Sequence, residues 1–443
     1  MKRLLLILIG LAVVAAAAIG WIVLGPGPLA FAGGNAVLLA NYKASDPTGV
    51  PASLKNASLI ERGEYLTRAA DCEACHTTKD GTPFAGGLAF NLPFGTLYSP
   101  NITPDKQTGI GNWSDADFLQ AVHKGIAPDG TRLYPAFPYA AYTMITDADA
   151  LAIKAYLFSL APVHASIPAS TLKFPYNQRW LMTFWSAFFN PDARFSPNPD
   201  KSPDWNRGAY LAEALAHCGE CHTPRNLMQA LDNRKKFAGA VAAGWKAYNI
   251  TQDKDSGIGG WNDETLTRFL SLGHAEGYGT ASGPMGEAVD KSLRHLTPED
   301  IKALVIYLRS IPATADPDLP APKLAPPPAA LMASAADAHA AALFSGACAG
   351  CHGWTGASPV LTYASFTGAR SVNDPSARNV AQAIVWGVNR QTPSGPVNMP
   401  AFGSSYSDAE IAILANYVTA RFGAAASQIG AADVARIRRE ASQ

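Results

Sequence analysis

The chain contains one five-residue pattern three times: Cys72-Glu73-Ala74-Cys75-His76, Cys218-Gly219-Glu220-Cys221-His222 and Cys348-Ala349-Gly350-Cys351-His352. The three motifs use all 6 cysteines of the 443 residues, and a histidine directly follows each second cysteine. Two intervening residues allow one helical turn to present both sulfurs to a porphyrin edge, and the next residue can reach its iron. The sequence therefore predicts three covalently bound haem c groups, with His76, His222 and His352 as proximal iron ligands.

Paired cysteines have two other common uses. They form disulfides in oxidising compartments, and they hold zinc in small knuckles. Neither use requires a histidine after every second cysteine, so covalent haem explains the pattern better.

The sequence around the first two motifs repeats. Arg62-Gly63-Glu64-Tyr65-Leu66 precedes the first cysteine pair, and Arg207-Gly208-Ala209-Tyr210-Leu211 precedes the second. Farther along, Asn101-Ile102-Thr103 recurs as Asn249-Ile250-Thr251. Repetition on this scale indicates tandem units of one supersecondary design.

Each unit closes with the signature of a helix start. Thr146, Thr297 and Ser407 are each followed three residues later by an acid, and apolar residues then recur at helical spacing. We therefore expect an all-α fold of three tandem cytochrome c-type units behind an N-terminal transmembrane helix. The expected segments are 1–32 (anchor or signal), 50–165 (unit 1), 166–202 (aromatic connector), 203–314 (unit 2), 315–335 (Pro/Ala linker), 336–425 (unit 3) and 426–443 (C-terminal tail).

The N-terminus resembles an export signal. Lys2 and Arg3 precede a run of 21 uncharged residues, Leu4–Leu24, and about 20 apolar residues span a bilayer as a helix. The segment is either a retained anchor or a signal cleaved after Ala32. Basic residues stay in the cytoplasm, so the haem units are expected on the periplasmic side of the inner membrane.

The sixth iron ligands are expected to be methionines, because His/Met ligation raises the reduction potential and leaves no open position. Met285 and Met399 each lie next to a proline, 12 residues after a helix-ending glycine. The corresponding residue of the first unit is Phe137, so Met144 is the candidate there and Met182 is the alternative.

Two further features concern partners. Lys+Arg and Asp+Glu number 35 each, so no net field favours nucleic acid. The connector holds many aromatic side chains between Phe174 and Phe189. Such residues favour membrane interfaces and protein hot spots, so the segment either docks on the bilayer or a partner enzyme, or forms a buried strap between units.

Residues from about Leu59 to Phe422 resemble the triheme cytochrome c subunits of membrane-bound periplasmic dehydrogenases. The resemblance is carried by Arg62–Leu66, Cys72–His76, Asn101–Asp105, Leu133–Tyr139, His217–Arg225 and Met399–Phe402. It implies a catalytic partner of molybdenum, flavin or pyrroloquinoline quinone type that oxidises aldehydes, alcohols or sugar acids. It also implies that the electrons pass on to ubiquinone.

Phe137 departs from the alcohol-oxidising members, which look to have methionine there. This difference and the N-terminal anchor favour a molybdenum or flavin partner, by analogy with the family. The chain itself then needs no catalytic residue. The competing interpretation is a peroxidase-like haem enzyme, in which one iron keeps an open position.

Overall fold

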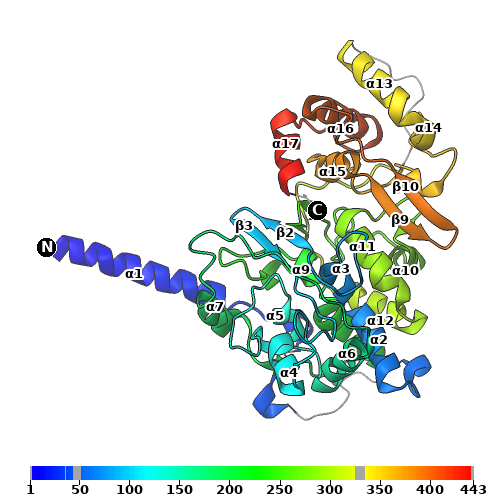
Figure 1. The fold of residues 1–443 in the computed structure, drawn as a ribbon. Coiled ribbons are helices and arrows are strands. Elements are labelled where there is room, and N and C mark those ends of the chain that lie inside the picture. Colours follow the sequence, from blue (N-terminus) through cyan, green and yellow to red (C-terminus); the bar gives the residue numbers. More distant parts are fainter. Residues whose placement is uncertain (1, 35, 43–50, 325–334, 441–443) are drawn as a thin grey trace.

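The computed structural model describes residues 2–34, 36–42, 51–324 and 335–440. Helix α1 (Lys2–Val23) projects from the body of the molecule (Figure 1), and none of its residues is buried. Within the described ranges it is the one helix long and apolar enough to cross a membrane. The predicted N-terminal apolar helix is therefore present.

The first unit is mainly helical and carries one hairpin. It comprises α2 (Leu59–Ala69), α3 (Cys72–His76), α4 (Asp115–Lys124), α5 (Tyr139–Tyr142), α6 (Asp147–Ser159), β2 (Ala89–Leu92) and β3 (Gly95–Tyr98). The connector that follows holds α7 (Leu181–Phe189) and β4 (Ala193–Arg194). Strand β4 pairs antiparallel with β1 (Val37–Leu38), so the segment after α1 is attached to the connector.

The second and third units repeat this plan with variations. The second comprises α8 (Pro203–Tyr210), the π-helical η4 (Leu211–Leu215), α9 (Gly219–His222), β5 (Ala240–Ala242), β6 (Trp245–Ala247), α10 (Asp263–Leu272), β7 (His274–Ala275), β8 (Gly279–Thr280), α11 (Gly283–Lys291) and α12 (Pro298–Arg309). The third comprises α13 (Ala335–Ala347), α14 (Ala349–His352), α15 (Arg378–Trp386), β9 (Val388–Thr392), β10 (Gly395–Met399), α16 (Asp408–Phe422) and α17 (Ala431–Glu440). Short 3₁₀ turns occupy Ala30–Ala32, Leu39–Asn41, Ala52–Leu54, Asn233–Lys235, Leu293–His295 and Thr362–Ala364.

The fold is less purely helical than expected. Over the part of the chain that the structure describes, the strands form five two-stranded antiparallel sheets, each a short hairpin or strap between helices. The sequence did not reveal them because strands of two to five residues have too little alternation to stand out from loops.

The three closing helices begin at the expected residues. The hydroxyls of Thr146, Thr297 and Ser407 each accept a hydrogen bond from the backbone N–H three residues on. Each hydroxyl thereby pairs with one of the backbone N–H groups that have no partner within the first turn of a helix. The predicted starts of α6, α12 and α16 are therefore confirmed.

The repeated glycine allows two helices to cross closely. Gly63 of α2 lies against the backbone of Ala152 in α6, and a Cβ on this glycine would lie 2.0 Å from the Ala152 carbonyl oxygen. Gly208 of α8 meets Ala303 of α12 with the same 2.0 Å spacing. Glycine recurs at this position because any side chain would separate the paired helices of each unit.

The second unit contains one extra residue before its cysteine pair. Arg207 follows Arg62 by 145 positions, whereas Cys218 follows Cys72 by 146. The structure accommodates the extra residue in the π-helical turn Leu211–Leu215, directly after α8. Single π turns of this kind occur within α-helices, frequently at functional sites, and this one lies just before the second attachment motif.

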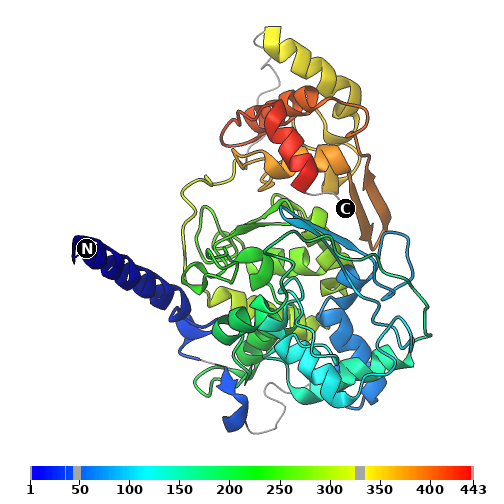
Figure 2. The same ribbon diagram turned by 60° about the vertical axis from the view of Figure 1, so that its left-hand side comes forward.

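Units 1 and 2 share one hydrophobic core. A single buried cluster contains Leu66, Met144 and Ile153 of the first unit together with Leu211 and Leu304 of the second. The third unit has a separate cluster around Phe344 and Ile411, and it sits above the other two in Figures 1 and 2. The chain therefore forms one two-unit body and one smaller unit.

Two tyrosines exchange hydrogen bonds between the first two units. Tyr65 of unit 1 donates its hydroxyl hydrogen to Asp300 of unit 2 at 2.5 Å. Tyr210 of unit 2 donates to Asp149 of unit 1 at 2.7 Å. Equivalent residues thus make equivalent contacts in both directions, which is the pattern of an isologous interface, here within one chain.

An arginine pairs with each of these aspartates inside its own unit. Arg207 donates to Asp300 at 2.8 and 2.7 Å, and Arg62 donates to Asp149 at 3.1 and 2.5 Å. The side chain of Arg207 is 10% exposed and that of Arg62 is 28% exposed. The two networks therefore match in geometry but differ in burial.

The third unit is joined to the second by a buried arginine. Arg390 of β9 is 2% exposed; it forms an ion pair with Asp290 at 2.9 Å and donates to the carbonyl of Ala281 at 2.8 Å. The backbone of Lys246 and the amide of Asn379 exchange two further hydrogen bonds. These contacts fix the third unit on the face formed by α11 and β6.

Candidate haem-binding sites

Each cysteine pair lies on a single short helical turn. The turns α3, α9 and α14 end at His76, His222 and His352, as the spacing predicts. All six cysteines are free in the structure, so none is used in a disulfide. Each turn therefore offers two sulfurs and a histidine from one side.

Burial keeps most of these thiols neutral. It raises the pKa of Cys72 and of Cys218 to about 12 and that of Cys348 to about 11. A thiol that is desolvated in this way is a poor anion. An environment that disfavours a charged sulfur also suits the uncharged thioether that haem attachment would form at each cysteine.

The three histidines are oriented in one way. Nδ1 of His76 lies 2.8 Å from the carbonyl oxygen of Pro100, and Nδ1 of His222 lies 2.6 Å from that of Tyr248. Nδ1 of His352 lies 2.6 Å from the carbonyl oxygen of Ala364. A carbonyl can only accept, so Nδ1 carries the proton and Nε2 keeps its lone pair for a metal. The side chains present therefore fit a proximal haem ligand in each unit.

The repeated Asn-Ile-Thr segment holds the accepting carbonyl in place. Asn101 follows Pro100 directly; its side-chain oxygen accepts from the backbone N–H of Thr103 at 2.9 Å, and its Nδ2 donates to the carbonyl of Val163 at 2.7 Å. Asn249, which follows Tyr248, makes the same two contacts, at 2.8 Å with Thr251 and 2.6 Å with Thr314. The sequence reveals this repeat but not its structural role. In the structure, the repeated segment fixes the loop whose carbonyl orients the histidine.

The third unit orients its histidine by another route. It lacks the Asn-Ile-Thr segment, and the accepting carbonyl belongs to the 3₁₀ turn Thr362–Ala364. Phe366 stacks on the imidazole of His352 with ring centroids 4.2 Å apart. The ring is thus positioned by one hydrogen bond and one aromatic contact.

The candidate methionines lie in different settings. Met144 is 3% exposed, in the shared core between α5 and α6. Met285 is half-buried near the start of α11 and packs against the same core, and Met399 ends β10 and packs against the core of the third unit. The alternative, Met182, packs with Tyr139 and Trp185 in a small cluster at the connector.

The attachment motifs of the first two units face each other across the shared core. Tyr142 meets the ring of His217, the residue before Cys218, with centroids 5.5 Å apart. Its hydroxyl donates to the carbonyl of Ala70 at 2.6 Å, two residues before Cys72. One tyrosine therefore touches both attachment loops.

The helix that carries Met285 also contacts the first attachment motif. Lys291 at the end of α11 forms an ion pair with Glu73, which lies between the first two cysteines. Asp71 directly precedes Cys72, and its Oδ1 is buried. Burial raises the pKa of Asp71 well above its usual value, and the carboxylates of Glu287 and Glu73 raise it further. Sequence reasoning missed these contacts because nothing in the repeat shows which unit a side chain faces.

Comparison with known proteins agrees with this geometry. The family model described as "Cytochrome c" matches residues 60–161, and the model described as "Cytochrome C oxidase, cbb3-type, subunit III" matches residues 335–418. Both matched regions contain an attachment motif. Cytochrome c domains carry covalently bound haem c, so the chain is a haem protein.

Three relatives align along most of this chain. The fructose dehydrogenase cytochrome subunit of Gluconobacter japonicus is 38% identical over 93% of this chain and 89% of its own length. The gluconate 2-dehydrogenase cytochrome c subunit of Pantoea cypripedii is 36% identical over 87% of this chain and 90% of its own length. The cytochrome c subunit of the quinone-type alcohol dehydrogenase of Gluconobacter oxydans is 34% identical over 86% of this chain and 82% of its own length.

The resemblance predicted from the motifs is therefore confirmed. The three relatives just described match along most of their own length and are cytochrome subunits of dehydrogenases. Each attachment turn of this chain has the sulfurs and the oriented histidine that haem c requires. The chain is an electron-transfer protein, and it belongs to the family of cytochrome c subunits of dehydrogenases.

Proposed function

We propose that the chain binds three haem c groups and carries electrons from a catalytic dehydrogenase subunit to ubiquinone in the inner membrane. One observation carries the haem count: all three motif histidines have Nδ1 tied to a backbone carbonyl. The shared orientation leaves Nε2 of each histidine available to an iron, which supports haem binding at all three motifs. The three units would correspond to residues 50–165, 203–314 and 336–425.

In this proposal the cysteines attach the porphyrins and each histidine is one axial ligand. Met144, Met285 and Met399 supply the opposite ligand in units 1, 2 and 3. Haem iron supplies one-electron oxidation and reduction. With both a histidine and a methionine, each iron would have no open position, and a site of this kind would favour electron transfer over the peroxidase-like alternative.

The partner is proposed to oxidise a sugar or a sugar acid. Support comes from the relatives named for fructose and gluconate, which match this chain along 93% and 87% of its length. An aldehyde- or alcohol-oxidising enzyme with molybdenum or pyrroloquinoline quinone is the other option. The identity of the partner's own cofactor follows from whichever enzyme copurifies.

The proposed location rests on α1. This 22-residue helix, apolar after Lys2 and Arg3, is long enough to span the hydrocarbon core of a bilayer. The two basic residues would remain in the cytoplasm, which would place the haem units in the periplasm. Ubiquinone dissolved in the same membrane is then within reach of the anchored protein.

Purification in mild detergent tests the proposed function. We expect a dehydrogenase subunit to coelute with the cytochrome, and the complex to reduce a ubiquinone analogue when a sugar or sugar acid is supplied. Elution of the cytochrome alone, without quinone reduction in the membranes it came from, would contradict the proposal. Carbon monoxide binding to the native reduced protein would instead indicate an open iron and favour the haem-enzyme alternative.

A further inference from the structure

Helix α7 has one buried and one exposed face, and its residues Leu181–Phe189 include no charged side chain. Trp185 is 7% exposed; its ring packs on Tyr139 at 5.9 Å and its indole N–H donates to the carbonyl of Met228 at 2.8 Å. Trp180, Phe184 and Phe188 follow at intervals of four residues and are 60%, 59% and 50% exposed. Residues four apart lie on the same side of a helix, so the outward face is a stripe of three aromatic rings.

The exposed stripe continues beyond α7 onto neighbouring segments. Leu227 and Met228 lie in the loop that Trp185 holds, and they are 91% and 50% exposed. Phe174 and Tyr176, just before α7, are 80% and 50% exposed. We call the outward residues Phe174, Tyr176, Trp180, Phe184, Phe188, Leu227 and Met228 the aromatic face. Exposed large apolar side chains that gather on one side of a protein in this way point to an interaction site.

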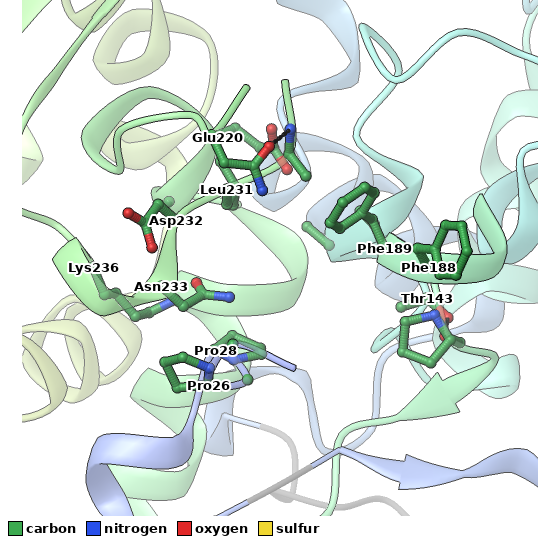
Figure 3. A pocket seen from close by; sticks show the side chains of 18 of the residues that line it. Pro26, Pro28, Thr143, Phe188, Phe189, Glu220, Leu231, Asp232, Asn233 and Lys236 are labelled. Carbon is green, nitrogen blue, oxygen red and sulfur yellow. Dashed lines mark hydrogen bonds between the residues drawn. The ribbon is translucent and has the colours of Figure 1, made fainter. Parts of the chain in front are cut away.

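The aromatic face lies where α1 enters the body. Arg234 stacks on the ring of Trp21 at 4.1 Å and donates to the carbonyl of Trp21. A cavity of about 250 Å³ is lined by Ile22 and Val23 of α1 and by Phe188 and Phe189 of α7. Figure 3 shows Phe188 and Phe189 across this cavity from Pro26 and Pro28 of the segment that leaves α1.

The short link from α1 restricts where the body can lie. Leu29, which is 2% exposed and belongs to the shared core, follows only six positions after Val23, the end of α1. Six extended residues reach at most about 20 Å. If α1 spans the bilayer, the body therefore stays at the membrane surface, and the side that carries α7 is the side on which α1 leaves (Figure 1).

We propose that the aromatic face lies in the interfacial layer of the bilayer beside the exit of α1, and that lipid is its occupant. Amphipathic helices with Trp and Phe on one face bury that face about 5–10 Å into the boundary between headgroups and acyl chains. The proposal rests on the membrane anchorage in the proposed function. It adds a second contact, which holds the two-unit body in a fixed orientation.

Photocrosslinking in native membranes tests this assignment. The full-length, haem-loaded chain would carry p-benzoylphenylalanine in place of Phe184, of Phe188, or of Trp354 as the matched control. Trp354 is 43% exposed and follows α14, in the unit that lies apart from α1 in Figures 1 and 2. The haem absorption of each variant reports whether it has folded.

We expect mass spectrometry to find lipid adducts at positions 184 and 188, at least tenfold more than at position 354. A crosslink from either position to another polypeptide would show that a protein covers the face and would overturn the proposal. Benzophenone that stays unreacted at both positions would show that the face is in water, because the excited ketone needs a nearby C–H bond to react, and this outcome would also overturn the proposal. The readout does not depend on turnover, so it stands even if quinone reduction fails.

Discussion

Replacing Asp300 with asparagine should lower the free energy of unfolding by about 3–5 kcal/mol, the cost of breaking a buried ion pair by removing one charge. Asp300 is 1% exposed and accepts hydrogen bonds from Arg207 and from Tyr65 of the other unit. The substitution removes the negative charge that Asp300 places beside the buried Arg207 guanidinium. Urea unfolding of the haem-loaded protein, followed by the haem absorption band, measures the loss.

Asp149 provides the matched control. Asp149→Asn removes the equivalent contacts with Arg62 and Tyr210, but Arg62 is more exposed than Arg207. Water can therefore solvate the charge of Arg62 when the Asp149 carboxylate is removed. We expect the free energy of unfolding to fall by about half as much as for Asp300→Asn. A loss below about 1 kcal/mol for Asp300→Asn would show that the buried network does not stabilise the two-unit body. Equal losses for the two substitutions would show that the greater exposure of Arg62 makes no difference.

Replacing Met285 with histidine should lower the reduction potential of one haem by on the order of 0.1 V or more. A thioether ligand favours ferrous iron, whereas an imidazole favours the ferric state, and axial ligands set haem potentials over a range of about 0.8 V. A redox titration followed by visible absorption would resolve the shifted component. The other two components should keep their potentials.

Met228→His is the matched control for this substitution. Met228 is 50% exposed in the loop next to α7, so the same chemical change there should leave all three potentials unaltered. An unchanged titration of the Met285 variant would remove Met285 as the sixth ligand. A shift in both variants would point to a general effect of added histidine.

The sequence predicted the parts of the fold that local chemistry determines. Cysteine spacing identified the attachment turns, and the caps at Thr146, Thr297 and Ser407 located the closing helices. Both signals lie within a few residues of the chain, where geometry follows from the residues themselves. The ligand methionines and the unit boundaries stay predictions.

The sequence did not predict how the units pair. Tyr65 and Tyr210 occupy one repeat position, and Asp149 and Asp300 occupy another, so the repeat alone is equally compatible with contacts inside a unit or between units. The packing of α2 and α8 around a shared core places each tyrosine next to the aspartate of the other unit. The short hairpins and the π turn at Leu211–Leu215 were missed because they depend on backbone packing rather than on residue pattern.

The aromatic connector has a buried side and an exposed side in one helix. The sequence left open whether it forms a buried strap or a docking surface. In the structure, Trp185 acts as the strap, and Trp180 and Phe184 point outward. A helix of nine residues is long enough to have one buried and one exposed face. Amino-acid composition alone does not show which aromatic residues lie on which face.

The intact mass of the purified full-length protein tests the central claim most directly. Expression in a host that matures c-type cytochromes should give the polypeptide plus three haem groups, which remain attached in acidified acetone. Conversion of His352 and its two cysteines to alanine should reduce the count to two. A wild-type mass with two haems, one haem or none would contradict the proposal that all three motifs bind haem.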